Sequence, residues 1–170
     1  MELYFPRILS KNCTAAEQYI TSLTGDTAMK IIQLSLFVEN RPGALSDVCR
    51  TLKENNINIS TLSLADTQSF GILRLLVKEH ELAKNVLEKA GFVVKTTEVL
   101  AIPVSNQPGG LAQLLDTLQD CQVEYMYAFA SELNDRAVMV FRFADPDKAL
   151  LCLKEAHSDI IREAELYKLA

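Results

Sequence analysis

An internal repeat constrains this chain more than any other feature of its sequence. The segment NRPGALSDVCRTL (40–52) recurs as NQPGGLAQLLDTL (106–118), at an offset of 66 residues. Apolar residues also recur at positions i, i+3, i+4 and i+7 of both segments, the spacing of one face of a helix. Agreement in both identity and period indicates a duplicated chain. The identical pairs are Asn40 and Asn106, Pro42 and Pro108, Gly43 and Gly109, Leu45 and Leu111, Thr51 and Thr117, and Leu52 and Leu118.

The two copies show the same order of expected elements. In the first copy, alternating or continuous apolar runs predict strands at 31–38, 57–65, 71–77 and 92–97, with helices at 43–55 and 79–90. In the second copy we expect strands at 98–104, 123–130, 137–144 and within 160–169, and helices at 109–120 and after Asp145. Gly91 stands where a left-handed helix end is expected, and Asp145 followed by Pro146 is a favoured helix start. The order is therefore βαββαβ, twice.

This order predicts an α+β fold of two ferredoxin-like units, each an antiparallel sheet with both helices on one face. The expected domains are 30–97 and 98–170. No Gly/Ser/Pro linker separates Thr97 from Glu98, so we expect the units to pack together. Residues 1–29 lie outside the repeat, and two interpretations of them stay open. They form a short helix from Thr14 to Gly25, or they are an extension before a start at Met29 with no role in function.

Composition excludes several classes of function. The chain has 170 residues, of which 49% are hydrophobic, and a formal net charge of −5, so it is globular and has no basic surface for nucleic acid. No apolar run reaches the roughly 18 residues of a membrane span, and the N-terminus lacks a secretory signal pattern. The four cysteines have no CxxC spacing. We therefore expect a cytoplasmic chain with reduced thiols, no metal and no cofactor.

The Asn-x-Pro-Gly loop is the candidate binding site in both copies. Proline helps to end the strand, while Gly43 and Gly109 let another group approach the backbone. The first turn of the next helix leaves N–H groups without intrahelical partners at the positive end of the helix dipole. A carboxylate or phosphate can sit there, and the amides of Asn40 and Asn106 can assist. A plain turn and helix cap is the competing interpretation.

The segment LFVENRPGALSDVCRTLKENNINISTLSLA (36–65) resembles the opening of an ACT domain, the amino-acid-sensing module attached to many enzymes of amino-acid metabolism. The resemblance covers essentially all of 30–97. It extends more weakly to 98–170, where Gly110 replaces Ala44 and Glu124 replaces Asn58. It implies a stand-alone tandem ACT protein without a catalytic domain, which binds a free amino acid.

The resemblance also implies where the ligand lies, in the loop between the first strand and the first helix, often between two ACT units. The implied residues of the first copy are Asn40, Arg41, Pro42, Gly43, Ala44 and Leu45, with Asn58, Ile59 and Ser60 approaching from the second strand of a neighbouring unit. Those of the second copy are Asn106, Gln107, Pro108, Gly109, Gly110 and Leu111. Because Glu124 departs from the pattern, one functional site per chain stays open.

Three functions remain. The first is a regulatory amino-acid-binding protein without activity. The second is a regulatory subunit that docks on a separate enzyme, since ENRPGALSDV is similar in the small subunit of acetohydroxyacid synthase. The third is a small enzyme of the same fold, such as an acylphosphatase, which the loop resembles only in Arg41 and Gly43.

Catalysis is not expected, because His80 and His157 lack partners at ligand or triad spacing. A homo-oligomer such as a dimer is expected, because this type of sheet leaves an edge strand to pair.

Overall fold

The structure is a computed structural model that describes residues 26, 28–66, 70–133 and 136–169. The helix expected between Thr14 and Gly25 lies outside the described residues. So do the turn expected at 67–69 and the first two residues of the turn expected at 134–136.

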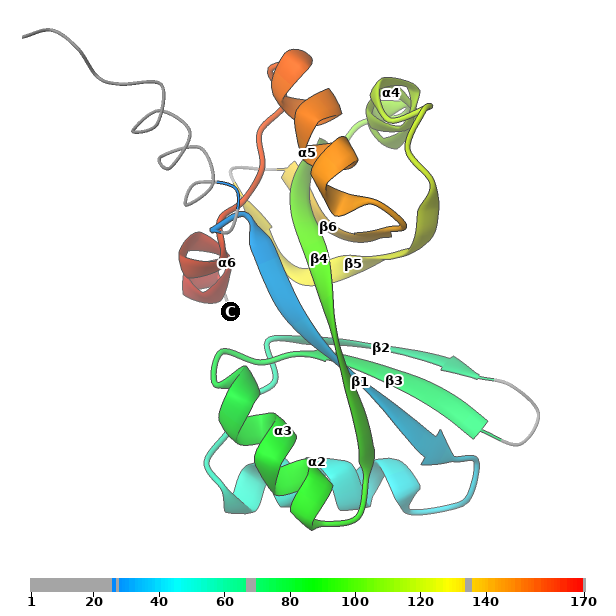
Figure 1. The fold of residues 1–170 in the computed structure, drawn as a ribbon, viewed down its shortest axis with the longest axis vertical. Helices are drawn as coiled ribbons and strands as arrows, with labels where there is room; N and C mark the ends of the chain where they lie inside the picture. Colours follow the sequence, from blue (N-terminus) through cyan, green and yellow to red (C-terminus); the bar gives the residue numbers. More distant parts are fainter. Residues whose placement is uncertain (1–25, 27, 67–69, 134–135, 170) are drawn as a thin grey trace, which may run out of the picture.

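The elements follow the repeated order (Figure 1). In the first repeat (30–97) they are β1 (Lys30–Glu39), α2 (Ala44–Glu54), β2 (Thr61–Asp66), β3 (Phe70–Leu76) and α3 (His80–Lys89). β4 (Val93–Ser105) runs from the first repeat into the second (98–170). The second repeat continues with α4 (Gly110–Thr117), β5 (Val123–Leu133), β6 (Arg136–Phe143), α5 (Pro146–Glu155) and α6 (Glu163–Leu169).

The two repeats share one six-stranded sheet of order β2-β3-β1-β4-β6-β5, in which all neighbours are antiparallel. β4 is the shared strand: its first half pairs with β1 and its second half with β6. The expected closing strand of the first copy and opening strand of the second are thus one strand of 13 residues. No turn separates them in the sequence, so the ladder continues through Thr97 and Glu98.

Four helices cover the same face of this sheet, as the alternation along β4 demonstrates. Val94 packs in the cluster beneath α2 and α3, while Leu100 and Ile102 pack beneath α4 and α5. These three residues are separated by even numbers of positions along one strand, so their side chains point to the same face of the sheet. Figure 1 places α2 and α3 at one end of the sheet and α4 and α5 at the other. The expected arrangement of helices on one face is confirmed.

The opposite face carries α6, where the prediction of a tail strand was wrong. Only Ile161 pairs with β4, as a single bridge to Ala101, and the chain then turns into α6. β1 occupies this edge of β4 as far as Leu100, so a strand here could pair only with the last five residues of β4. The following residues place Leu166 and Leu169 at helical spacing, and both pack on the sheet with Val99 and Ala101.

The second strand also starts later than expected. The prediction began it at Ile57, whereas β2 begins at Thr61. The N–H of Ile57 donates to the carbonyl of Leu52 at 3.0 Å, and the Ile57 side chain is buried in the first cluster. The apolar residue therefore closes the end of α2 and does not open the strand.

A buried polar cluster joins the repeats on the α6 side of the sheet. Gln33 of β1 is fully buried; its Nε2 donates to the Tyr125 hydroxyl at 2.8 Å, and its Oε1 accepts from the Tyr127 hydroxyl at 2.9 Å. Nε2 also lies 3.2 Å from Thr97 Oγ1 and 3.0 Å from Ser35 Oγ. β2 and β5, the outer strands of the sheet, contact each other. The sheet therefore curls until its two edges meet.

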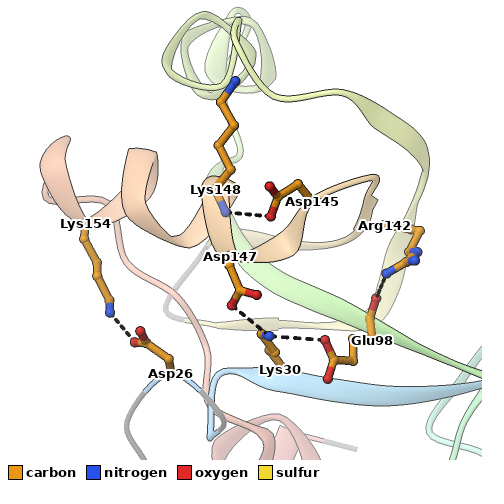
Figure 2. A network of polar contacts seen from close by, with 8 residues as sticks. All are labelled: Asp26, Lys30, Glu98, Arg142, Asp145, Asp147, Lys148 and Lys154. Carbon is orange, nitrogen blue, oxygen red and sulfur yellow. Dashed lines mark hydrogen bonds and ion pairs between the residues drawn. The ribbon is translucent and has the colours of Figure 1, made fainter. Parts of the chain in front are cut away.

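An ion network joins the repeats on the other side (Figure 2). Lys30 Nζ, at the start of β1, lies 2.8 Å from Asp147 Oδ1 of α5 and 3.3 Å from Glu98 Oε2 of β4. The hydrogen bond to Asp147, followed by that to Glu98, raises the pKa of Lys30 despite partial burial. Arg142 Nη1 donates to the Glu98 carbonyl at 2.9 Å, so the middle of β4 is held from two strands.

Candidate functional site

The glycines of the two Asn-x-Pro-Gly loops have the same backbone conformation. Gly43 and Gly109 are the helix N-caps, with φ of 87° and 89°, in the left-handed region that favours glycine. Nothing lies within 4 Å of where a Cβ would stand on either residue. The repeated glycines are therefore explained by backbone conformation, and close approach of another protein group is not needed.

Each helix start leaves two backbone N–H groups free. The first helical hydrogen bonds are donated by Asp47 to Gly43 and by Gln113 to Gly109. Within the described part of the chain, the N–H groups of the two preceding residues have no acceptor, and neither helix has a side-chain cap. These residues are Leu45 and Ser46 on α2, and Leu111 and Ala112 on α4. Each pair lies at the positive end of a helix dipole.

In the second repeat the two residues that carry these N–H groups line a cavity of about 470 Å³, here called the loop cavity. Five of the residues implied by the resemblance line it: Asn106, Gln107, Pro108, Gly109 and Leu111. Ala112, Val104, Ala137 and Met139 add apolar surface. No acidic residue stands in the first turn of α4, so nothing on that turn opposes an anion. The loop cavity therefore combines residues that carry free backbone N–H groups with apolar walls.

The loop of the first repeat is more charged. Arg41 Nε lies 3.2 Å from Glu39 Oε2, and Arg41 Nη2 lies 3.2 Å from Asp47 Oδ2. Asp47 stands in the first turn of α2, where a carboxylate already complements the helix dipole. A ligand carboxylate at this loop would have to compete with two protein carboxylates.

A second type of hollow, here called the edge groove, lies beside each loop where the second helix of the repeat ends. The groove of the first repeat measures about 540 Å³ and that of the second about 280 Å³. Ten residue pairs line the two grooves at the 66-residue offset: 37/103, 38/104, 39/105, 44/110, 47/113, 51/117, 70/136, 91/157, 92/158 and 93/159. The duplication thus extends to surface hollows that the loop motif alone did not reveal.

The edge grooves differ in chemistry. Phe70 and Val93 line the first, while Arg136 and Asp159 stand at the equivalent positions of the second and pair at 2.7 Å. Motif matching missed these lining residues, because they come from the third strand and the end of the second helix. The residues at these equivalent positions are not alike in the two copies, so no sequence signal marks them.

The remaining expected residues are dispersed. Arg41 and Ala44 line the first edge groove and Gly110 lines the second. Asn58, Ile59 and Ser60 lie at the other end of the first repeat, because Thr61 pairs with Leu76 whereas Glu39, before the loop, pairs with Phe70. Within one chain the structure therefore does not bring the 58–60 segment to the loop at 40–45.

The surrounding contacts account for both residues at which the second repeat departs from the motif. A Cβ on Gly110 would stand 2.1 Å from the Ser105 carbonyl oxygen, so the tighter turn excludes the alanine found at position 44. Glu124, which replaces Asn58, lies 3.3 Å from Arg142 Nε. Neither replacement blocks the loop cavity.

Other types of site find no support in the described residues. Among them, no three His, Cys, Asp or Glu side chains are grouped so that they could hold a metal ion. None of the helices in the described ranges has the length and apolar character needed to cross a membrane.

Comparison with protein-family models shows which family the chain matches. Residues 29–170 match the model of the ACT domain pair. The crystal structure of protein BT0572 from Bacteroides thetaiotaomicron is similar at 40% identity and a TM-score of 0.77, over 84% of this chain and 99% of that one. A comparison with curated proteins gives no match.

More distant structures share the fold. The ligand-free regulatory subunit of aspartate kinase from Thermus thermophilus is 17% identical, with a TM-score of 0.55 over 75% of this chain and 93% of that one. The corresponding subunit from Thermus flavus is 15% identical, with a TM-score of 0.54 over 76% and 94%. The element order, which repeats up to the second helix of each copy, the matched loops and the family model agree, and the chain belongs to the family of ACT domain pairs.

Proposed function

We propose that this protein is a non-catalytic regulatory protein that binds a free amino acid at the loop between the first strand and first helix of a repeat. The observation that carries the proposal is the loop cavity, which is lined by the two residues with free N–H groups and by apolar side chains. The α-carboxylate would accept from Leu111 and Ala112, and the side chain would lie toward Met139 and Val104. The fold shared with regulatory subunits of aspartate kinase supports a regulatory role.

The second repeat is the better site for the carboxylate, and the first repeat is the second candidate. Hydrogen bonds to a charged group contribute about 1.5–3 kcal/mol each. Two of them together with the burial of an apolar side chain, which contributes about 1.5–3 kcal/mol, correspond to a Kd from roughly micromolar to millimolar once the cost of ordering the ligand is subtracted. That range suits a protein that responds to metabolite concentration.

The test is calorimetric titration of the protein with each of the twenty amino acids, using two charge variants. Ala112→Asp places a carboxylate in the first turn of α4, and Ser46→Asp is the matched change in α2, 66 residues earlier. Both positions are exposed, and an acidic residue at a helix start stabilises the helix, so neither variant should unfold. We expect an amino acid with an apolar side chain to bind, Ala112→Asp to weaken it at least tenfold, and Ser46→Asp to change it less than threefold.

The other outcomes are equally distinct. If only Ser46→Asp weakens binding, the site is the loop of the first repeat, and the assignment to the loop cavity is wrong. If both variants bind normally, the ligand lies away from both loops. If no amino acid binds, the sensor function is wrong, and the loops are turns and caps.

The expected assembly belongs to the same proposal. We propose a cytoplasmic homodimer, in which the 58–60 segment of one copy approaches a loop of the other. The exposed apolar side chains of Leu62 and Leu64 on β2 support a contact there. Docking on an enzyme of amino-acid metabolism is the alternative assembly, and co-purification with such an enzyme distinguishes the two.

A further inference from the structure

Two free thiols meet between the helices of the second repeat. The Sγ atoms of Cys121, in the connection after α4, and Cys152, on α5, are 3.5 Å apart. Both residues are free cysteines, as is the exposed Cys49 on α2. The paired thiols are 31 residues apart in the sequence, so only the tertiary fold brings them together.

The surrounding packing holds both sulfur atoms in place. Cys121 is buried and Cys152 half-buried in one apolar cluster with Leu118, Leu150 and Leu153. A disulfide has an S–S bond of about 2.05 Å, so the sulfur atoms must approach by about 1.5 Å.

The thiol pair is confined to one repeat. The positions 66 residues earlier are Asn55 and Val86, so the first repeat has no equivalent pair. Asn55 is instead the C-cap of α2, and its side-chain amide donates to the Thr51 carbonyl at 2.8 Å. Any chemistry of this pair therefore acts on α4 and α5 alone.

We propose that Cys121 and Cys152 form a reversible oxidation site, at which a low-molecular-weight disulfide such as oxidised glutathione converts the two thiols into an intrachain disulfide that ties α4 to α5. The more accessible Cys152 thiolate attacks the reagent, forms a mixed disulfide and releases one thiol. The Cys121 thiolate then attacks the Cys152 sulfur and releases the second thiol. The protein loses two hydrogens as two protons and two electrons, and one disulfide reagent becomes two thiols.

The second step should depend strongly on pH. Burial, followed by the hydrogen bond with Cys152, raises the pKa of Cys121 to about 11. Since the thiolate is the nucleophile, its fraction grows as pH rises toward that value. Ring closure should therefore accelerate about tenfold per pH unit between pH 7 and 9, and the mixed disulfide should accumulate at the lower pH.

The experiment uses the full chain with Cys13→Ser and Cys49→Ser, which leaves only the pair. The protein is incubated with oxidised glutathione at pH 8, quenched with acid and measured by intact mass spectrometry. We expect a mass lower by two hydrogens and no glutathione adduct, with a crosslinked Cys121–Cys152 peptide and recovery of both thiols in dithiothreitol. The crosslinked form should also have a higher Tm.

Two controls separate the steps. Adding Cys121→Ser should stop the reaction at a glutathione adduct on Cys152, and adding Cys152→Ser should leave the buried Cys121 almost unreacted. The same peptide mapping is repeated on the chain without substitutions, in case the serine changes unfold the protein. In that chain the modification of the exposed Cys49 shows that the reagent is active. The proposal would be overturned if Cys121 and Cys152 stay free in a chain whose Cys49 is fully modified. It would also be overturned if Cys121 and Cys152 each carry one glutathione. The inference does not depend on amino-acid binding.

Discussion

At the scale of single residues, one backbone outlier stands out at the end of α5. His157 has φ of 52°, and the equivalent position of the first repeat is Gly91, with φ of 91°. The turns are identical in their hydrogen bonds: residue 157 donates to Lys154 at 3.0 Å, as residue 91 donates to Glu88 at 3.0 Å. A histidine in this region is strained, whereas a glycine is not.

We therefore expect His157→Gly to raise the free energy of unfolding. The left-handed conformation costs a residue with a Cβ roughly 1–2 kcal/mol, and part of the gain is lost to the greater freedom of glycine in the unfolded chain. The expected net gain is about 0.5–1 kcal/mol in urea unfolding. His157→Ala is the control, since it removes the imidazole but keeps the strain. Stability of His157→Gly below that of His157→Ala would show that strain is not the main term.

At the scale of elements, α6 is the part of the second repeat that departs from the first. The first repeat closes with the first half of β4, whereas the second closes with one bridge at Ile161 and a helix on the opposite face. Tyr167 on α6 donates its hydroxyl to the Val77 carbonyl at 2.8 Å, and Leu166 is fully buried. α6 thus connects the second repeat to the end of β3 in the first.

Leu166→Ala should reveal how much this helix contributes. Deleting a fully buried leucine side chain costs about 2–5 kcal/mol, and we expect about 3 kcal/mol here, measured by urea unfolding. Lys168→Ala, two residues later and exposed, is the matched control and should change stability by less than about 0.5 kcal/mol. A loss below about 1 kcal/mol for Leu166→Ala would mean that α6 does not stabilise the sheet.

At the scale of the whole molecule, the buried cluster around Gln33 fixes how the repeats sit on each other. Gln33 belongs to the first repeat, and its two tyrosine partners to the second. Arg74 Cζ lies 3.9 Å from the Tyr125 ring centroid, which adds a cation–π contact between the repeats. Desolvation by burial raises the pKa of Tyr127, so its hydroxyl stays a hydrogen-bond donor through the neutral range.

Gln33→Leu should destabilise the protein by about 1–3 kcal/mol, because it leaves the half-buried hydroxyls of Tyr125 and Tyr127 without this partner. The triple variant with Tyr125→Phe and Tyr127→Phe should regain at least about 1 kcal/mol of that loss, since the two tyrosine hydroxyls are then absent and only the hydroxyls of Ser35 and Thr97 lose a contact. Denaturant unfolding of the single and triple variants measures both effects. Equal stability of the single and triple variants would mean that the hydroxyls find other hydrogen-bond partners. The cluster would then not determine how the repeats pack.

The sequence by itself determined most of the secondary structure and the position of the candidate loops. Helical spacing, the Asn-x-Pro-Gly turns and Asp145 before Pro146 are local signals, and local hydrogen bonds realise them, such as that from Lys148 N to Asp145 Oδ1 at 3.0 Å. The duplication supplied the fold class, because two copies of one pattern must bury the same faces. The family then followed from a motif that both copies carry.

Only the tertiary structure decided how the copies combine. The two consecutive strands expected at 92–97 and 98–104 merge into β4 because the merged strand pairs with both β1 and β6. Whether the last segment becomes a strand or a helix depends on how much of the edge of β4 is left free. The edge grooves and the Cys121–Cys152 pair unite residues distant in the chain, which no local pattern marks. Periodicity records which side of an element is buried, but not what buries it.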